Sequence, residues 1–446
     1  MSALADQAAT MALLRGLSGA APIETPISAV FVGRDTVWKL RRAVRLPFLD
    51  FTSLAERRRT ALRELELNAP HAPGLYRDVV AVTRTEAGVE LDGPGAPVDW
   101  VLRMARVPEG DFLDAIAARH GLTPALLDAL GDAVAAYHAA LPPLAIDPVA
   151  SLARVIAGNR DSALAAGLPA AAVQGWTADA QAALHRQAGL LRARAAAGFV
   201  RRCHGDLHLG NLCLWQGRPT PFDALEFDEA LARTDTGSDL AFLLMDLEMR
   251  AGRAAANRVL NRTVARGGDA GVVAGLGLYQ ALRAMVRAHV EARGGHAEAS
   301  ARYLARAVSG LRRPPSARVV AIGGLPGSGK STLFEALLQA AGSAQRRGGD
   351  ARTRPATTET RIGQCRYLGD AWPLLDCPGS IEFLHDAAAA LAIADLAVPV
   401  SVPVPARAAS LAPLVRLLAE AHLPFVVFVN RIDTLDGAVR ETLAAL

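Results

Sequence analysis

The stretch HGDLHLGN at residues 204–211 decides how the first two-thirds of the chain is interpreted. Its aspartate, Asp206, precedes its asparagine, Asn211, by five residues. In phosphoryl transfer, an aspartate so placed accepts the proton of the attacking hydroxyl, and the asparagine holds a Mg²⁺ ion. Asp223 follows Asn211 by twelve residues. Its carboxylate is the kind of ligand that binds a Mg²⁺ ion together with phosphate oxygens. We therefore predict Asp206 as catalytic base and Asn211 and Asp223 as metal ligands. The alternative is a turn with a capping aspartate.

Phosphoryl transfer also needs a cation on the nucleotide phosphates, and Lys39 is the candidate. It lies in the apolar strand pattern of residues 37–40, where a lysine is costly unless it is paired. Glu64, in the helical pattern of residues 54–67, is the natural partner. Glu66 is close by, and the sequence does not define the phase of the helix. The alternative for Lys39 is an exposed lysine at a sheet edge.

The chain divides into three blocks by pattern. Residues 1–107 alternate short apolar runs with turns, residues 108–313 are mainly helical, and residues 314–446 alternate apolar strands with helices. Alternation of the last kind is typical of a parallel sheet covered by helices. We expect an α+β bilobal domain formed by the first two blocks, followed by an α/β domain with a mostly parallel sheet.

Residues 23–252 resemble the aminoglycoside phosphotransferase-like domain of bacterial fusion proteins that carry a P-loop ATP-binding domain behind it. The resemblance rests on the stretches at residues 37–40, 48–51, 64–68, 204–211, 222–227 and 239–243. It implies a protein-kinase-like bilobal fold and the metal and base roles given above. It also implies that Lys39 contacts ATP phosphates and that Asp239 braces the catalytic loop. Residues 25–31 resemble the phosphate-covering hairpin, with Pro26 and Ala29 where bulkier residues are usual.

The stretch GLPGSGKS at residues 324–331 satisfies the P-loop pattern, and it stands between an apolar strand pattern and a helical pattern as the motif requires. Backbone N–H groups of such a loop surround phosphate oxygens, the lysine reaches the β- and γ-phosphates, and the next serine binds Mg²⁺. The expected nucleotide-binding residues are Gly324, Gly327, Ser328, Gly329, Lys330, Ser331 and Thr332, with Ser331 also a metal ligand.

Two later motifs indicate a GTPase-like subclass. DCPG at residues 376–379 ends an apolar strand, as does NRID at residues 430–433, which is similar to the guanine-reading NKxD motif. Residues 366–433 thus resemble the G domain of elongation factor G-like translational GTPases. The resemblance implies nucleotide contacts by Asp376, Gly379, Asn430 and Asp433, with Asp433 on the guanine edge and a switch threonine at 357 or 358.

Other features of this block leave its nucleotide open. Arg431 replaces the motif lysine and does not place its charge as lysine does. Only 13 residues follow Asp433, so we expect a reduced or truncated domain. The P-loop itself resembles the ATP-binding half of the phosphotransferase fusions. An ordinary strand-end turn is the alternative for residues 430–433.

Composition bounds the class of protein. The chain has 446 residues, 51% of them hydrophobic, and a formal net charge of +4 without long runs of like charge, so nucleic-acid binding is not indicated. The four cysteines form no CxxC pair, which argues against a zinc site. No signal-peptide or membrane-span pattern occurs, and we expect a cytoplasmic protein with no membrane partner.

The sequence therefore predicts an ATP- and Mg²⁺-dependent phosphotransferase that acts on a small-molecule hydroxyl, with a second site for ATP or GTP. The competing interpretation is a GTP-binding regulatory or translation-factor-like GTPase with a degenerate kinase-like domain. Nucleotide preference distinguishes the two. The phosphoryl acceptor and the oligomeric state are not encoded in any recognisable pattern.

Overall fold

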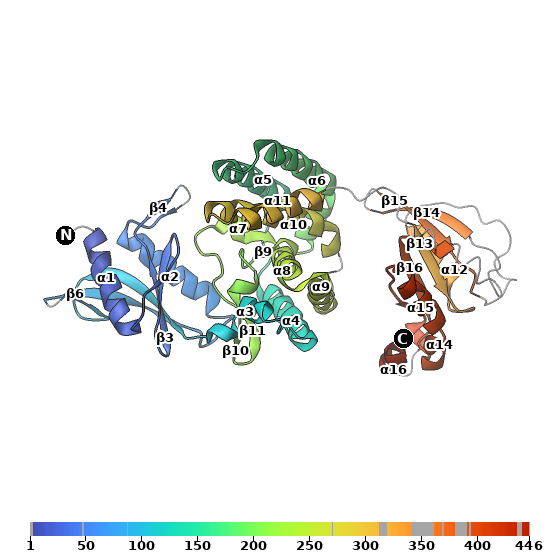
Figure 1. Ribbon diagram of the computed structural model, residues 1–446, viewed down its shortest axis with the longest axis horizontal. Coiled ribbons are helices and arrows are strands. Elements are labelled where there is room, and N and C mark those ends of the chain that lie inside the picture. The colour runs from blue at the N-terminus through green and yellow to red at the C-terminus, as the bar shows by residue number, and fades with distance from the viewer. Residues whose placement is uncertain are drawn as a thin grey trace. The chain divides into compact units, whose positions relative to one another are not determined.

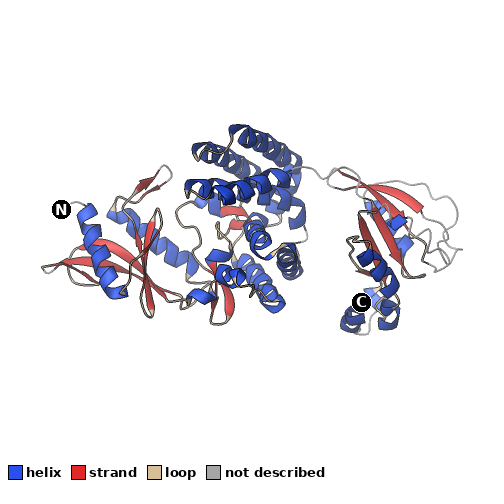
Figure 2. Cartoon of the chain, in the orientation of Figure 1, coloured by secondary structure: helices blue, strands red, loops and turns tan. Residues whose placement is uncertain are grey.

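The computed structural model describes residues 3–46, 49–86, 88–269, 271–311, 319–340, 361–367, 370–379, 390–391, 394–434 and 439–445. The chain divides into two compact units, Met1–Arg312 and Arg313–Leu446. In the first unit, most strands lie in one lobe and most helices in the other, whereas strands and helices are mixed in the second unit (Figure 2). None of the described helices is long and apolar enough to cross a lipid bilayer.

The first lobe of the first unit is a six-stranded antiparallel sheet with the order β1-β2-β3-β8-β6-β7. Its elements are α1 (Ala3–Ser18), β1 (Ile23–Glu24), β2 (Ser28–Val32), β3 (Thr36–Arg41), α2 (Leu54–Asn68), β6 (Tyr76–Thr85), β7 (Gly88–Leu91) and β8 (Pro97–Ala105). A separate hairpin is formed by β4 (Arg45–Leu46) and β5 (Leu49–Asp50). The hairpin predicted near residue 30 is β2 with β3.

Two helices pack against different faces of this sheet (Figure 1). Leu14 of α1 packs in one hydrophobic cluster with Leu40, and Leu65 of α2 packs in another with Leu102. Successive side chains of a strand point to opposite faces. Leu40 therefore faces α1, whereas its neighbour Lys39 faces α2.

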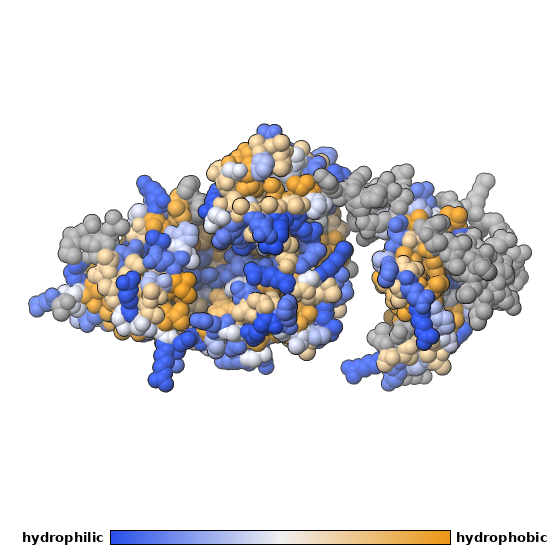
Figure 3. Space-filling model, viewed as in Figure 1, coloured by the Kyte–Doolittle hydropathy of each residue, from blue (hydrophilic) through white to orange (hydrophobic). Residues whose placement is uncertain are grey.

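The second lobe is helical, with two small two-stranded sheets that hold the segment of residues 200–235. Its elements are η1 (Glu109–Asp111), α3 (Leu113–Ala118), α4 (Pro124–Ala140), α5 (Pro148–Ala165), α6 (Ala170–Ala196), β9 (Val200–Arg202), η2 (Leu209–Asn211), β10 (Leu212–Trp215), β11 (Arg218–Pro221), α7 (Glu229–Ala232), β12 (Arg233–Asp235), α8 (Thr236–Ala251), α9 (Arg253–Gly267), α10 (Val272–Arg293) and α11 (Ala297–Leu311). Hydrophilic side chains are frequent on the face of this lobe that Figure 3 shows.

Helix α8 is the centre of the helical lobe, since residues 236–247 are all buried. Phe242 and Met245 lie in a hydrophobic cluster with residues of α5, α6, α10 and α11. Leu243 and Leu247 lie in a second cluster with residues of α3, α4 and α9. Because both faces of α8 are packed, its first turn is a rigid support for the loop that crosses it.

The second unit contains a five-stranded sheet with the order β14-β15-β13-β16-β17. Its elements are β13 (Val320–Gly324), α12 (Lys330–Ala340), β14 (Arg361–Tyr367), β15 (Asp370–Asp376), β16 (Leu396–Ser401), α14 (Pro405–Ala409), α15 (Ala412–Glu420), β17 (Phe428–Val429), η4 (Ile432–Thr434) and α16 (Val439–Ala445). Phe334 of α12 packs with Ile322, whereas Leu418 of α15 packs with Ala321. The alternation of Ala321 and Ile322 thus places the two helices on opposite faces.

The sequence predicted a mostly parallel sheet, and the observed sheet is mixed, with three parallel pairings and one antiparallel pairing at its edge. β13 pairs in parallel with β15 and β16, and β16 pairs in parallel with β17, but β14 runs antiparallel to β15. Only two residues separate the end of β14 from the start of β15. So short a connection joins antiparallel strands only, since a parallel crossover needs a dozen residues or more.

Candidate active site

The loop that carries the HGDLHLGN stretch is held by Asp239 in the first turn of α8. The Asp239 carboxylate accepts hydrogen bonds from the backbone N–H groups of His204 (3.2 Å) and Gly205 (2.9 Å), and it lies 3.0 Å from Nε2 of His138. Complete burial acts to raise the pKa of Asp239, but the bond from His138 and neighbouring positive charge outweigh it and lower the pKa. The carboxylate is thus a charged brace for the loop backbone.

Asp206 and Asn211 are in direct contact. Nδ2 of Asn211 donates to the backbone carbonyl and to Oδ2 of Asp206, both at 2.9 Å. His208 accepts the N–H of Gly210 at Nδ1, so a neutral His208 ring carries its proton on Nε2, which lies 3.4 Å from Oδ2 of Asp206. Desolvation acts to raise the pKa of Asp206, but the His208 bond and charge lower it below the ordinary value. With 44% of its side chain exposed, this ionised carboxylate is accessible from solvent.

The hairpin β10–β11 brings Asp223 to the same place. Asn211 accepts the N–H of Phe222 at its backbone carbonyl (3.1 Å), which puts Asp223 one residue from a direct contact with the loop. Asp223 has a φ of 61°, in the left-handed region, and its N–H donates to the hydroxyl of Tyr76 at 2.9 Å. A non-glycine residue held in this region is a strained position that the surrounding contacts must support.

Lys39 lies between two carboxylates. Its Nζ is 2.8 Å from Oε1 of Glu64 and 2.5 Å from Oδ1 of Asp223. Burial acts to lower the pKa of Lys39, but Asp223 and then Glu64 outweigh it and raise the pKa. Burial acts in the opposite sense on Asp223, and the charge of Lys39 brings the pKa of Asp223 down to about 2. Glu64 is the partner and Glu66 is not, since Glu66 points outward and pairs with Arg63 at 2.8 Å.

Two residues of this site were missed in the sequence. Arg41 and Glu226 are buried and form an ion pair, and Arg41 also pairs with Glu64. The signal for Arg41 was present, because residues two apart in a strand share a face and Arg41 follows Lys39 by two. Glu226 had no comparable signal, since the irregular segment after Asp223 has no periodicity from which a direction follows.

The oxygen atoms at this site suit Mg²⁺. With Nδ2 of Asn211 used on Asp206, the amide presents Oδ1 elsewhere, and Asp223 uses only Oδ1 on Lys39. Carboxylate oxygens of Glu64, Asp223 and Glu226 lie within 4.8 Å of one another. Carboxylate and amide oxygens are the ligands of this hard cation.

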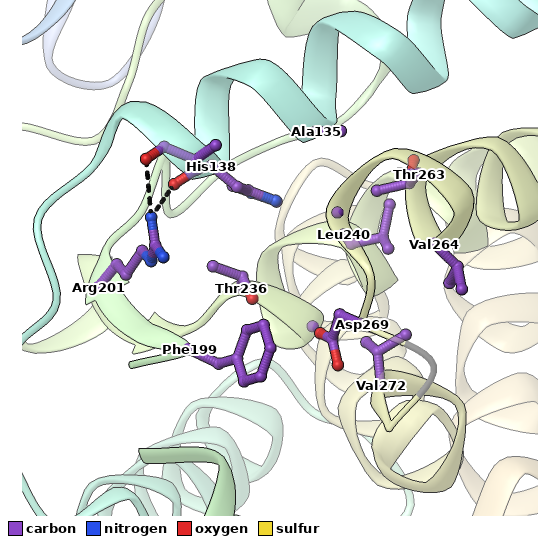
Figure 4. A pocket seen from close by; sticks show the side chains of 13 residues that line it. Ala135, His138, Phe199, Arg201, Thr236, Leu240, Thr263, Val264, Asp269 and Val272 are labelled. Carbon is purple, nitrogen blue, oxygen red and sulfur yellow. Dashed lines mark hydrogen bonds between the residues drawn. The ribbon is translucent and has the colours of Figure 1, made fainter. Parts of the chain in front are cut away.

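A separate pocket of ≈ 100 Å³ lies among α4, α8 and α9 (Figure 4). His138, Thr236, Leu240 and Asp269 are among its lining residues, and Asp206 is not. Arg201 also lines it, but its guanidinium donates to backbone carbonyls of α4 and the residue that follows. This pocket is therefore distinct from the candidate active site, although His138 contacts both the pocket and Asp239.

In the second unit, three glycines of the P-loop have positive φ: Gly324 (134°), Gly327 (74°) and Gly329 (94°). Ser328 is buried and Thr332 is exposed. Nζ of Lys330 donates to the carbonyl of Leu325 at 3.0 Å, so the lysine lies over its own loop. Burial lowers the pKa of Lys330, and Asp376 counteracts the shift.

Asp376 ends β15 next to this loop. It is fully buried, and neither of its carboxylate oxygens has a hydrogen bond that meets ordinary geometry among the described residues. Burial raises the pKa of Asp376, while Ser331 and nearby cations act to lower it. A buried carboxylate beside the P-loop serine fits a Mg²⁺ site. A Cβ at Gly379 would lie 2.3 Å from Nζ of Lys330, so this position touches the loop directly.

The NRID stretch is only partly joined to the P-loop. Nδ2 of Asn430 donates to the carbonyl of Ser328 at 3.0 Å, whereas Asp433 lies exposed in η4. Arg431, in the lysine position of the motif, has a φ of 58°. The switch threonine expected at 357 or 358 lies outside the described residues.

Comparison with known proteins gives matches to both units. Residues 315–446 match the family model of the elongation factor Tu GTP binding domain. An elongation factor G-like protein of Synechocystis sp. is 36% identical over 143 residues, 29% of this chain and 21% of that protein. An uncharacterized protein of Mycobacterium tuberculosis is 28% identical over 335 residues, 72% of this chain, and the chain spans 65% of that relative's length.

Solved structures give a weaker likeness over the first unit. The crystal structure of aminoglycoside phosphotransferase APH(4)-Ia covers 69% of this chain and 98% of its own, with 13% identity and a TM-score of 0.41. The first unit thus has two lobes, a lysine–glutamate pair and an Asp–Asn contact in its loop. Residues 315–446, which follow it in the chain, match the family of elongation factor Tu GTP-binding domains.

Proposed function

We propose that the first unit is a phosphotransferase that moves the γ-phosphoryl group of ATP to the hydroxyl of a small molecule, with Asp206 as catalytic base. The observation that carries the proposal is the convergence of two contacts, Asp206 with Asn211 and Lys39 with Asp223, through the Asn211–Phe222 backbone bond. Residues from a strand, a loop and a hairpin meet there, which a merely structural turn does not require.

Each side chain has a role that its geometry supports. Asp206 is ionised and half exposed, so it accepts the proton of an incoming hydroxyl. The Nδ2 bond from Asn211 to Oδ2 fixes the orientation of that carboxylate. Lys39 provides positive charge for the phosphates, while Glu64 holds it in position. Asn211 and Asp223 would hold Mg²⁺, which when bound neutralises charge on the phosphates.

The test is a phosphorylation screen of a metabolite extract with [γ-³²P]ATP, with Asp206→Asn protein run in parallel. Loss of a general base lowers turnover by about 10²–10⁴-fold. We expect one or more labelled products with the unaltered protein and a loss of that order in the variant. Equal labelling by both proteins would show that Asp206 is not the base.

We further propose that the second unit binds a nucleoside triphosphate through Gly324, Gly327, Ser328, Gly329, Lys330, Ser331 and Thr332. Ser331 and Asp376 would hold the metal, and Gly379, Asn430 and Asp433 would contact the nucleotide. The contact of Asn430 with the P-loop and the family match of residues 315–446 support GTP here. We also propose that the second unit hydrolyses the nucleoside triphosphate that it binds.

A second candidate follows from the same observations, namely a GTP-regulated protein whose kinase-like unit is degenerate. It predicts GTP binding that is lost in Lys330→Ala and Asp433→Ala, with no labelled product in the screen. ATP binding that is lost in Lys39→Ala favours the phosphotransferase. Isothermal titration of each variant with ATP and with GTP distinguishes the two.

A further inference from the structure

Arg41 is buried at the centre of an ion-pair chain that continues beyond the lysine–glutamate pair. Its side chain is 4% exposed. Its Nη2 pairs with Oε2 of Glu64 and with Oε1 of Glu226, and its Nη1 donates to the hydroxyl of Ser28 at 2.8 Å. Lys39 holds the other oxygen of Glu64. Glu64 therefore forms an ion pair with Lys39 through one carboxylate oxygen and with Arg41 through the other.

The charges of this cluster require Arg41. Three carboxylates, those of Glu64, Asp223 and Glu226, lie within 4.8 Å of one another, and the cations paired with them among the described residues are Lys39 and Arg41. Without Arg41, one ammonium would face three carboxylates, and buried like charges repel strongly. The Glu64 side chain would then turn away from the cluster, and that change would release Lys39.

We propose that Arg41 is a positioning residue that holds the Glu64 carboxylate aimed at Lys39, and thereby sets the affinity of the first unit for MgATP. The inference rests on the proposed phosphotransferase function and extends it. Among the described residues, Arg41 forms no hydrogen bond or ion pair with Asp206, Asn211 or Asp223, and its ion pairs are with Glu64 and Glu226. Its effect on Lys39 therefore passes through Glu64.

An arginine suits this position better than a lysine does. A planar guanidinium has five N–H donors in a fixed fork, and here it bridges carboxylates from α2 and from the segment after Asp223 while it also reaches Ser28. A lysine restores the charge but has one nitrogen for three partners. Arg41→Lys is therefore expected to be intermediate between the wild type and Arg41→Ala.

The experiment measures MgATP affinity by isothermal titration in full-length protein that carries Lys330→Ala, so that the second unit does not contribute. We expect Arg41→Ala to weaken MgATP binding about tenfold, because it removes one charged contact. Arg41→Lys keeps part of that contact and should weaken binding about threefold. Arg103→Ala is the matched control. Arg103 lies in the same sheet and pairs with Asp78, and both side chains are partly exposed. The Arg103→Ala variant should therefore bind MgATP as tightly as the Lys330→Ala parent protein.

A double-mutant cycle separates positioning from general loss of structure. In a Glu64→Gln background, Arg41→Ala should change MgATP affinity by less than twofold, because the carboxylate through which it acts is gone. A tenfold effect that persists in that background would overturn the proposal, as would wild-type affinity in Arg41→Ala. If Arg41→Ala does not fold, the same cycle with Arg41→Lys decides by the same criteria.

The binding measurements distinguish failure of the phosphotransferase function from failure of the role of Arg41. Absence of MgATP binding in Lys330→Ala protein that retains Arg41 overturns the phosphotransferase assignment and with it the role of Arg41. Unchanged binding in Arg41→Ala, beside weakened binding in Lys39→Ala, overturns the role of Arg41 alone.

Discussion

Opposite charges in contact make up the interior of the candidate site. Lys39, Arg41, Glu64 and Glu226 are removed from water to different degrees, and each is compensated by a neighbour. Burying an unpaired charge is strongly unfavourable, whereas a paired and hydrogen-bonded charge is tolerated. Removal of one member therefore disturbs the charge balance of the others as well as its own contact.

Glu226 gives this cluster a predicted pH dependence. Burial, with the charge of Glu64, raises its pKa from 4.5 to about 7, although Arg41 acts to lower it. The folded protein thus holds more protons than the unfolded chain between these values, so the free energy of unfolding falls as the pH rises from about 4.5 to about 7. Denaturant unfolding at pH 5 and pH 7.5 should show a decrease on the order of 1–3 kcal/mol from this group.

Glu226→Gln provides the comparison for that prediction. Glutamine has nearly the same shape and does not titrate, so the variant should lose the part of the pH slope that Glu226 contributes. If the two proteins show the same slope across this window, the pKa of Glu226 in the folded protein is not raised.

At the scale of elements, the P-loop depends on a close approach between two strand ends. Gly324 ends β13 with a φ of 134°, and a Cβ there would lie 2.3 Å from the carbonyl oxygen of Val400 in β16. Gly327 also has a positive φ, of 74°, but a Cβ there would meet nothing within 4 Å. A side chain at Gly327 would therefore meet backbone strain alone, whereas a side chain at Gly324 would also clash with β16.

Alanine substitutions test this difference. We expect Gly327→Ala to destabilise the second unit by about 1–2 kcal/mol, the strain of a left-handed residue with a side chain. Gly324→Ala should cost more, on the order of 3 kcal/mol, because the strands must also separate. Thermal unfolding of both variants measures the two effects, and equal losses would contradict the close approach of β13 and β16.

At the scale of the whole molecule, two units carry two candidate nucleotide sites on different folds. Fluorescent nucleotide titrations should give two sites in the wild type and one in either Lys39→Ala or Lys330→Ala. Phosphotransfer should fall at least about 100-fold in Lys39→Ala, the loss typical of a charge-stabilising group, and should persist in Lys330→Ala. A single site in the wild type would contradict this arrangement, as would loss of both sites in either variant.

Much of the fold follows from local pattern. The antiparallel hairpin of β2 and β3, helix α2, and the strand–loop–helix of the P-loop occupy the predicted places. The mixed sheet did not follow, because the apolar pattern of β15 was recognised and its antiparallel partner β14 was not. The stretch Arg361–Tyr367 has polar residues at 361, 364 and 366 without regular alternation, and it gives little sign of a buried strand.

The sequence by itself determined which residue types stand at which spacing: an aspartate five before an asparagine, a lysine in an apolar strand, and a glycine-rich loop between a strand and a helix. These are local properties, set by the short range over which turns, alternation and helical periodicity act. Only the tertiary structure decided that Glu64 and not Glu66 meets Lys39, and that Arg41 and Glu226 complete the charge cluster. Helix phase relative to a sheet and the direction of an irregular segment arise from packing between elements distant in the chain, which no local spacing records.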